Sequence, residues 1–399
     1  MTARRRARYA PGMDRERAAL YAGTVAAYSD IYLTQSILPL LSSEVGVGPA
    51  RAGLTVSAVV LAIAVASPVY GPLSDAVGRR RVMVGATALL SVATLACAFA
   101  PSFGALVALR ATQGLFVPGM TAVSLAYAGD QYEGGGLSKV VAGIIAASVM
   151  GGLLGRVLAG GIAAVGGWRA TFVVFAALTA TAVLLLWRGL GEPRAVRHAR
   201  VLEAWAAMVG HLSDPRLVGA YLVGGGLFFA FIGIFTYLPF RLSAPPYALA
   251  PALVSSVYLV YLAGTLSSRV AGRLSGRVAP RALIAVGLAV EAIGMALTTA
   301  RPLAVVVLGL VVLVVGTFTA QAVAPAFVNA TAANAKGGAS ALYLTSYYVG
   351  GTLGSALPGL AWQAAGWDGV VGACVAATVI AMVANALLCG RVPSRRGPG

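Results

Sequence analysis

Stretches of about twenty apolar residues recur along the whole chain, separated by short polar segments. A helix that rises 1.5 Å per residue needs about twenty residues to cross a hydrocarbon layer of about 30 Å. The pattern predicts an all-α integral membrane protein with twelve transmembrane helices. The predicted helices cover residues 19–41, 52–71, 82–100, 103–128, 138–164, 169–189, 217–240, 250–270, 281–299, 302–325, 338–362 and 369–390.

Two pairs of matching segments indicate that the chain is duplicated. GPLSDAVGRR (71–80) and GRLSGRVAPR (272–281) lie 201 positions apart, and each falls between two apolar stretches. GGLLGRVLAGGIAAVGGW (151–168) and GGTLGSALPGLAWQAAGW (350–367) agree at an offset of 199. Nearly equal offsets at two places predict two pseudo-symmetric bundles of six helices each. Binding near the bilayer midplane, where two such halves meet, is typical of transporters built this way.

Residues 191–216 form a long polar interruption between the two expected bundles. Apolar residues recur within it at three- and four-residue spacing, which predicts an amphipathic helix in the membrane interface. These residues are Val201, Leu202, Trp205, Met208, Val209 and Leu212. The chain then divides into a basic N-terminus (1–17), an N-terminal bundle (18–190), a linker (191–216), a C-terminal bundle (217–391) and a tail (392–399).

Composition and charge agree with a membrane protein. Of the 399 residues, 59% are hydrophobic and 10% charged, against roughly 45–50% and about 25% in soluble domains. The net charge is +17, and the basic residues concentrate at alternate ends of the expected helices. By the positive-inside rule, both termini and the linker are expected in the cytoplasm, facing anionic lipid headgroups rather than nucleic acid. Only Arg51, Arg169, Arg241 and Arg301 fall in the opposite loops.

The residue types that carry enzymatic chemistry are sparse. Cys97, Cys374 and Cys389 all fall inside expected helices without metal-ligand spacing, and the two histidines lie in the linker. The sequence contains no G-x-x-x-x-G-K-[ST] motif, so ATP hydrolysis within this chain is excluded. The sequence therefore predicts neither an enzyme, nor a metal site, nor a cofactor, and an ion gradient is the expected energy source.

Several motifs resemble the major facilitator superfamily over about residues 18–391. The segment 71–80 resembles its loop motif G-x-L-x-D-x-x-G-R-R/K, and the fourth expected helix contains the pattern L-x-x-x-R-x-x-Q-G of its twelve-helix drug:proton antiporters. The stretches YLPFRLSAPPYAL, YLVYLAGTLSSRVAGRL and ALYLTSYYVGG resemble bacterial arabinose-efflux-type permeases. The matching motif residues are Gly71, Asp75, Gly78, Arg79 and Arg80, then Leu106, Arg110, Gln113 and Gly114.

The resemblance implies a monomeric secondary transporter in the bacterial inner membrane. Its expected function is efflux of a small organic solute, such as a drug or sugar, in exchange for protons by alternating access. Two departures are present: Arg156 follows Gly155 where these antiporters usually have proline, and Gly276 stands where the first hairpin has Asp75. The first departure leaves proton-independent or symport-type uptake of a sugar or other metabolite as the alternative.

The basic hairpin is expected to act as a gate. A carboxylate at the cytoplasmic end of the second helix can pair with basic groups of the loop and favour one state of an inner gate. Exposed ion pairs contribute only about 0–1 kcal/mol, which suits a contact that must open and close. The resemblance assigns this role to Gly71, Asp75, Gly78, Arg79 and Arg80, whereas Arg81 is explained by the positive-inside rule.

Asp30 lies near the middle of the first expected helix. An ionised side chain at that depth costs about 2.5–3.5 kcal/mol on insertion scales, so it must face a cavity or a partner. A carboxyl group that gains and loses a proton as water access alternates meets the requirement for proton coupling. Two other roles stay open: a structural partner of an arginine, and a contact for a cationic solute.

Three further ionisable residues lie inside expected helices. Arg110 lies about 10 Å from the outer end of its helix, and the resemblance implies proton transfer there, with Gln113 one turn away able to hold a water or the solute. A structural, snorkelling Arg110 is the alternative. Arg156 is expected to bind an anionic group or to neutralise Asp30, and Glu291 to serve packing or an ion pair rather than coupling.

A cavity wall of aromatic and polar side chains is expected on the helices that line the centre of such transporters. Mixed aromatic faces and polar tips suit amphipathic solutes, although aromatic residues in membrane helices often face lipid or core instead. The candidates are Gln35, Phe228, Phe231, Phe235, Gln321, Tyr343 and Tyr347.

Overall fold

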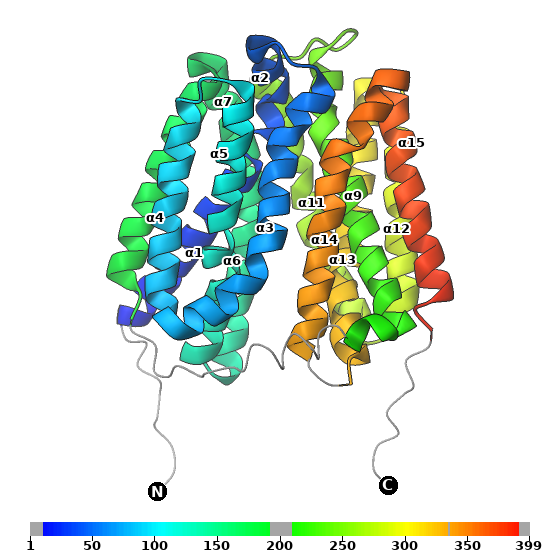
Figure 1. The fold of residues 1–399 in the computed structure, drawn as a ribbon. Coiled ribbons are helices and arrows are strands. Elements are labelled where there is room, and N and C mark those ends of the chain that lie inside the picture. Colours follow the sequence, from blue (N-terminus) through cyan, green and yellow to red (C-terminus); the bar gives the residue numbers. More distant parts are fainter. Residues whose placement is uncertain (1–10, 192–209, 334–335, 391–399) are drawn as a thin grey trace, which may run out of the picture.

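The computed structural model describes residues 11–191, 210–333 and 336–390, and every regular element in these ranges is a helix (Figure 1). The N-terminal half contains α1 (Pro11–Tyr32), the 3-10 helix η1 (Gln35–Ile37), α2 (Leu38–Val45), α3 (Pro49–Val77), α4 (Arg79–Ala98), α5 (Phe103–Phe116), α6 (Pro118–Gln131) and α7 (Gly134–Gly189). The C-terminal half contains η2 (His211–Ser213), α9 (Pro215–Ser243), α10 (Pro251–Ser256), η3 (Val257–Val260), α11 (Tyr261–Leu274), α12 (Pro280–Leu297), α13 (Leu303–Thr331), α14 (Lys336–Ala356) and α15 (Pro358–Leu387).

Nine helices in the described ranges are long and apolar enough to cross a membrane. This confirms the prediction of an all-α membrane protein, whereas the number of twelve crossings stays a prediction. Two of the nine turn sharply at a glycine: α7 leaves the helical region at Gly167, with φ 75°, and α15 at Gly366, with φ 58°. A positive φ is favourable only for glycine. The tight turns at these two positions explain why a Gly-Trp pair recurs at an offset of 199.

The first expected helix, 19–41, is not continuous. α1 ends at Tyr32, and the chain then passes through a turn and η1 into α2. Pro39 lies in the first turn of α2. It has no N–H to donate to the carbonyl of Gln35, and its ring clashes with that carbonyl in a continuous helix. The single helix predicted here was therefore wrong, and the break exposes backbone groups at the depth of the candidate site.

A second proline divides the fourth expected helix, 103–128. α5 ends at Phe116 and α6 begins at Pro118, which has no N–H to continue the ladder. The eighth expected helix, 250–270, is also divided, into α10, η3 and α11.

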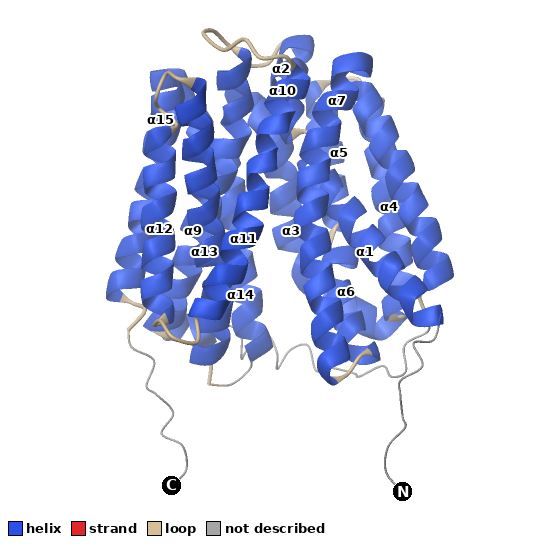
Figure 2. Cartoon of the chain, turned by 180° about the vertical axis from the view of Figure 1, so that it is seen from behind, coloured by secondary structure: helices blue, strands red, loops and turns tan. Residues whose placement is uncertain are grey.

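The two halves converge at the end of the molecule that carries α2 and diverge toward the end where α1 begins and α15 ends (Figures 1 and 2). We call these the upper and lower ends. Hydrogen bonds between described residues join the halves: Gln35 Nε2 donates to Thr236 Oγ1 at 2.9 Å, and Ser57 Oγ lies 2.7 Å from Ser355 Oγ. A buried apolar cluster also contains residues of both halves, among them Val56.

Small residues allow the backbones of the two halves to approach closely at the upper end. A Cβ on Gly53 of α3 would lie 2.6 Å from the carbonyl oxygen of Ser355, and one on Gly359 would lie 2.6 Å from Ala50 Cα. Such close packing replaces the hydrophobic effect as the attraction between helices in lipid.

At the lower end the two hairpins keep one equivalent contact. Arg80 Nη2 donates to the carbonyl of Trp187 at 2.7 Å, and Arg281 Nη2 donates to the carbonyl of Ala386. The arginines are 201 positions apart and the acceptors 199, so the duplication extends to this hydrogen bond. Of the amphipathic helix expected in the linker, Val201 to Val209 lie outside the described ranges, as do residues 1–10 and 391–399, and Leu212 lies in η2.

Candidate functional site

Arg110 binds the carbonyl groups that the break in α1 leaves free. Its side chain is fully buried, and its Nη1 and Nη2 donate to the backbone oxygens of Asp30 and Ile31 at 2.8 and 2.7 Å. The last carbonyls of a helix have no intrahelical partner, and the membrane interior offers no water to replace one. Arg110 therefore holds the end of α1 against α5, and its Nε also donates to the carbonyl of Thr55 on α3 at 3.2 Å.

Gln113 positions the Arg110 guanidinium. Its Oε1 accepts from Arg110 Nη1 at 2.7 Å, and its Nε2 donates to Thr94 Oγ1 of α4 at 2.6 Å. Gln113 is fully buried. The motif L-x-x-x-R-x-x-Q-G, which lies on α5, thus forms one hydrogen-bonded chain that connects α1, α5 and α4.

Asp30 faces the interior of the N-terminal half. Its Oδ2 accepts from Thr179 Oγ1 at 2.8 Å, and its Oδ1 has no hydrogen-bond partner among the described residues. The side chain is 1% exposed. Thr179 lies on the second segment of α7, so the carboxylate points into its own half. Asp30 contacts the Arg110 guanidinium through its backbone oxygen rather than its carboxylate.

Glu291 occupies a similar environment in the other half. Its Oε1 accepts from Thr317 Oγ1 at 2.8 Å and its Oε2 from Thr378 Oγ1 at 3.2 Å, and the side chain is fully buried. Thr378 is 199 positions after Thr179, so the same position of the repeat donates to a buried carboxylate in each half. Within the described ranges, no cation lies within ion-pair distance of Glu291, and the ion pair expected for it is absent there.

Arg156 lies where the two halves meet. Its Nε donates to Gln35 Oε1 and its Nη1 to the carbonyl of Gly152, each at 2.7 Å. Gln35 in turn donates to Thr236 of the other half. Among the described residues, Nη2 has no partner and no carboxylate forms an ion pair with this guanidinium, so the expected pairing with Asp30 is not present there.

Tyrosine rings surround the Arg156 guanidinium. Its Cζ lies 3.9 Å from the ring centroid of Tyr32 in the N-terminal half. In the C-terminal half, the ring centroids of Tyr261 and Tyr258 lie at 4.9 and 5.4 Å. These are cation–π distances. The sequence analysis did not single out these tyrosines, because residue spacing within one helix does not indicate which rings approach an arginine on another helix.

The aromatic candidates form one continuous cluster in the C-terminal half. Phe228 stacks on Tyr347 at 3.8 Å between centroids, and the rings of Phe231 and Phe235 lie 5.0 Å apart. Gln321 Nε2 donates to Tyr347 Oη at 2.7 Å. Phe228 also stacks on Phe231, Tyr343 stacks on Tyr347, and Phe231 contacts Tyr261. The cluster thus reaches the rings that surround Arg156.

The loop motif at residues 71–80 is joined to its own half by ion pairs. Arg79 Nη2 lies 2.7 Å from Asp75 Oδ1, and Arg79 Nε lies 2.9 Å from Asp130 Oδ2 at the end of α6. Arg79 Nη1 also donates to Ser74 Oγ at 2.6 Å. Gly78 has φ 105°, a backbone conformation that explains the glycine in the motif. Asp130 was not predicted, because the motif contains only one of the two carboxylates that the arginine bridges.

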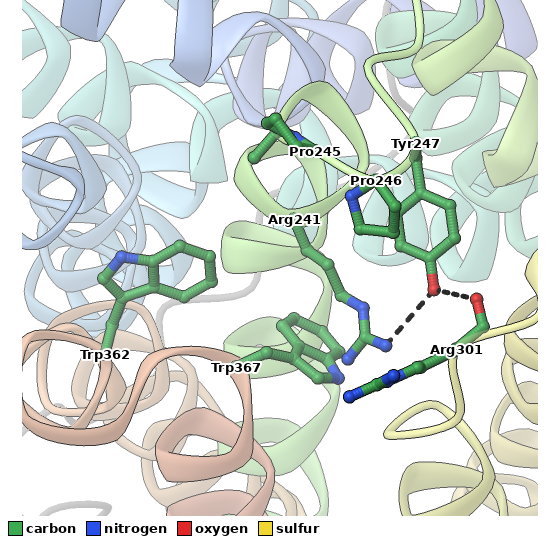
Figure 3. Close-up of a pocket in the computed structure, with 8 residues that line it drawn as sticks. Arg241, Pro245, Pro246, Tyr247, Arg301, Trp362 and Trp367 are labelled. Carbon is green, nitrogen blue, oxygen red and sulfur yellow. Dashed lines mark hydrogen bonds between the residues drawn. The ribbon is translucent and has the colours of Figure 1, made fainter.

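The four arginines expected on the non-cytoplasmic side all line two pockets at the upper end. The pocket of the C-terminal half has a volume of about 590 Å³, and that of the N-terminal half about 490 Å³. Figure 3 shows Arg241 and Arg301 beside Trp367 in the larger pocket. Arg241 Nη2 donates to the carbonyl of Ala300 at 2.7 Å, and its guanidinium lies 5.1 Å from a Trp367 ring. The smaller pocket contains Arg51, Arg169 and Glu44.

Comparisons with known proteins point to one family. The sequence model described as Major Facilitator Superfamily matches residues 20–270. The inner membrane transport protein YnfM of Escherichia coli is 31% identical over 380 residues, covering 95% of this chain and 90% of that protein. The uncharacterized MFS-type transporter YybF of Bacillus subtilis is 29% identical over 356 residues, covering 89% and 88%.

Two solved structures share the fold at low sequence identity. A bacterial homolog of the human lysosomal transporter Spinster, in an inward-facing and occupied conformation, has a TM-score of 0.78 at 16% identity and covers 94% of this chain and 96% of that chain. A D-xylose–proton symporter also has a TM-score of 0.78 at 16% identity and covers 97% and 99%.

Proposed function

Because the chain belongs to the major facilitator superfamily, we propose that it exports a small organic solute, such as a drug or a sugar, in exchange for protons. It is a multi-pass integral membrane transporter and not an enzyme. The proposal places a monomer in the bacterial inner membrane with both termini in the cytoplasm, driven by the proton gradient. The resemblance to drug:proton antiporters and arabinose-efflux-type permeases supports the outward direction.

The environment of Asp30 is the observation that carries the proton-coupling proposal. One carboxylate oxygen has only a threonine donor and the other has no partner among the described residues. An ionised group at such a site costs about 2.5–3.5 kcal/mol on insertion scales, a cost that binding a proton removes. The break in α1 begins three residues later, at Leu33. Movement at this break changes the access of water to the carboxyl group, which supports protonation on one side and release on the other.

The contacts between the halves support alternating access. The Gln35–Thr236 and Ser57–Ser355 hydrogen bonds and close glycine contacts join the halves at the upper end, while the ion pairs of the Asp75 hairpin stay within the N-terminal half. Each half can then move as one body about the centre. Opening the upper end requires breaking the Gln35–Thr236 and Ser57–Ser355 contacts.

A second candidate function is symport-type uptake of a sugar or other metabolite. The observation that favours it is Arg156, which stands where the resembling antiporters have proline. Protonation of Asp30 removes the repulsion between its carboxylate and a negative group on the solute. The proton and the solute therefore favour each other's binding, as symport requires.

Reconstituted vesicles with a trapped pH-sensitive dye test the coupling. Ethidium, chloramphenicol, L-arabinose and the anion 3-phenylpropionate are added in turn, and proton movement is recorded for the wild type and for Asp30→Asn. We expect at least one compound to evoke proton movement in the wild type and none to do so in the variant. Antiport and symport give opposite signs of the pH change.

Glu291→Gln is the matched control, because Glu291 is the buried carboxylate of the other half. It is expected to retain proton movement. Proton movement by Asp30→Asn at the wild-type rate, or its absence from the wild type with all four compounds, contradicts the proposal.

A further inference from the structure

We propose that the solute carries a carboxylate or phosphate group, and that the free edge of the Arg156 guanidinium binds this group between the two halves. This inference rests on the proposed transport function, because it names the chemical class of the solute that the same site accepts.

The buried charges of the described residues leave Arg156 without a counter-ion. Four ionisable side chains of the acidic and basic types are buried: Asp30, Arg110, Arg156 and Glu291. The Asp30 carboxylate accepts from Thr179, and Glu291 lies in the other half between two threonines, so neither pairs with Arg156. Desolvating a guanidinium is costly unless a negative group compensates it. The three tyrosine rings offset part of this cost, and a transported anion is the negative group that completes the compensation in this proposal.

Arg156 differs from Arg110 in how its donors are used. The Arg110 guanidinium donates to three backbone carbonyls and to Gln113, so its role is structural in large part. Arg156 has two neutral acceptors, Gln35 and Gly152, and its Nη2 stays without a partner although the side chain is 1% exposed. The planar fork of arginine is suited to bidentate binding of carboxylate or phosphate.

A second unpartnered donor lies beside the guanidinium. Tyr261 Oη has no hydrogen-bond partner among the described residues, its side chain is buried, and its ring centroid lies 4.9 Å from Arg156 Cζ. A hydroxyl and a guanidinium edge can both donate to one oxyanion. Arg156 belongs to α7 and Tyr261 to α11, so an anion bound by both would connect the two halves.

The surrounding aromatic rings indicate the chemical character of the part of the solute that lies away from its anionic group. Tyr261 contacts Phe231 and Phe235 at centroid distances of 5.3 and 4.8 Å, which continues the aromatic cluster away from the guanidinium. A solute with an anionic end at Arg156 places an apolar or aromatic end against these faces. The class is therefore an apolar or aromatic organic anion.

Thermal unfolding of the purified full-length protein tests the class. The probes are 3-phenylpropionate, 3-phenylpropanamide and 3-phenylpropylamine, which share one skeleton and carry a negative, no and a positive charge, with inorganic phosphate as a small anion. We expect 3-phenylpropionate to raise the unfolding temperature in a saturable manner and the amide and amine to leave it unchanged. No shift with either anion, or equal shifts with the amine, overturns the proposal.

Substitution of the arginine tests the site. Arg156→Gln is expected to abolish the shift, whereas Arg241→Gln, which removes another arginine stacked on aromatic rings, is expected to keep it. If Arg156→Gln does not fold, Arg156→Lys carries the test, with a weakening of 3-phenylpropionate binding of about tenfold expected from the loss of bidentate geometry. Wild-type binding in Arg156→Gln, or in Arg156→Lys where Arg156→Gln does not fold, overturns the assignment.

The pH-dye assay separates failure of this inference from failure of the proposed function. Saturable binding of 3-phenylpropionate without proton movement refutes proton coupling and retains the anion site. Proton movement evoked only by neutral or cationic compounds refutes the anion site and retains the transporter. An anion that moves with protons, rather than against them, identifies uptake as the direction.

Discussion

Replacing Arg110 by leucine tests whether this arginine holds the broken α1 in place. The substitution removes the donors to the backbone oxygens of Asp30 and Ile31. Because α1 ends at Tyr32, no N–H of the same helix replaces these donors. It also removes the donor to Gln113 Oε1. The leucine side chain fills part of the space but has no N–H or O–H group that can donate a hydrogen bond to these oxygens.

The expected loss follows from the number of acceptors left unpaired. Each buried unsatisfied polar group costs about 1–3 kcal/mol, so the two carbonyls together cost about 2–6 kcal/mol. This is a large part of the roughly 5–15 kcal/mol that stabilises a native protein. At about 2–4 °C per kcal/mol for a unit of 150–250 residues, we expect the unfolding temperature to fall by at least about 4 °C.

The assay is thermal unfolding of the detergent-purified protein, followed by circular dichroism and size-exclusion chromatography. Arg241→Leu is the control, because Arg241 donates to a single backbone carbonyl, that of Ala300, at the half-buried upper pocket. Arg110→Lys keeps the charge and three donors and is expected to lie between the wild type and Arg110→Leu. An Arg110→Leu variant that unfolds within about 2 °C of the wild type refutes the capping role.

Two further predictions concern the upper interface and the start of α9. Cysteines at Ser57 and Ser355, whose Oγ atoms lie 2.7 Å apart, are expected to crosslink rapidly, and Gly53→Ala to slow the reaction by separating the halves; an unchanged rate on gels contradicts the contact. Hydrogen bonding to Arg216 holds the pKa of Asp214 below its usual value. The resulting stability is present above the unfolded-state pKa of about 3.9 and is lost as the pH falls through the lowered pKa. Wild type is therefore expected to unfold at a higher temperature than Asp214→Asn at neutral pH, and the difference to vanish in strong acid. A pH series of thermal unfolding measures this, and a difference that persists in acid contradicts it.

The fold could be predicted in large part because its determinants are local and periodic. Runs of apolar residues indicate the helices directly, and nearly equal offsets between repeated segments indicate two halves. The turns at Gly167 and Gly366 were also visible as repeated glycines. The break in α1 was not predicted, although Pro39 was a signal, because an apolar run around a proline is compatible with both a kinked and a divided helix.

The candidate site was predicted by residue type but not by pairing. Asp30, Arg110 and Arg156 stood out as charges inside apolar runs, since such charges are costly in a membrane. Thr179 and Asp130 did not stand out, because a threonine in a helix and an acidic residue at a helix end are common. Their importance depends on which neighbour they reach.

The sequence by itself determined that this chain is a duplicated, all-helical membrane transporter of the major facilitator superfamily, because hydropathy, charge distribution and motifs are properties of neighbouring residues. Only the tertiary structure decided that Arg110 binds the end of α1, that Asp30 faces Thr179, and that Arg156 lies among tyrosines of both halves with one edge free. Those contacts join residues 79 to 149 positions apart or lie across the two halves. Their geometry follows from how the helices pack, which no local pattern in the chain specifies.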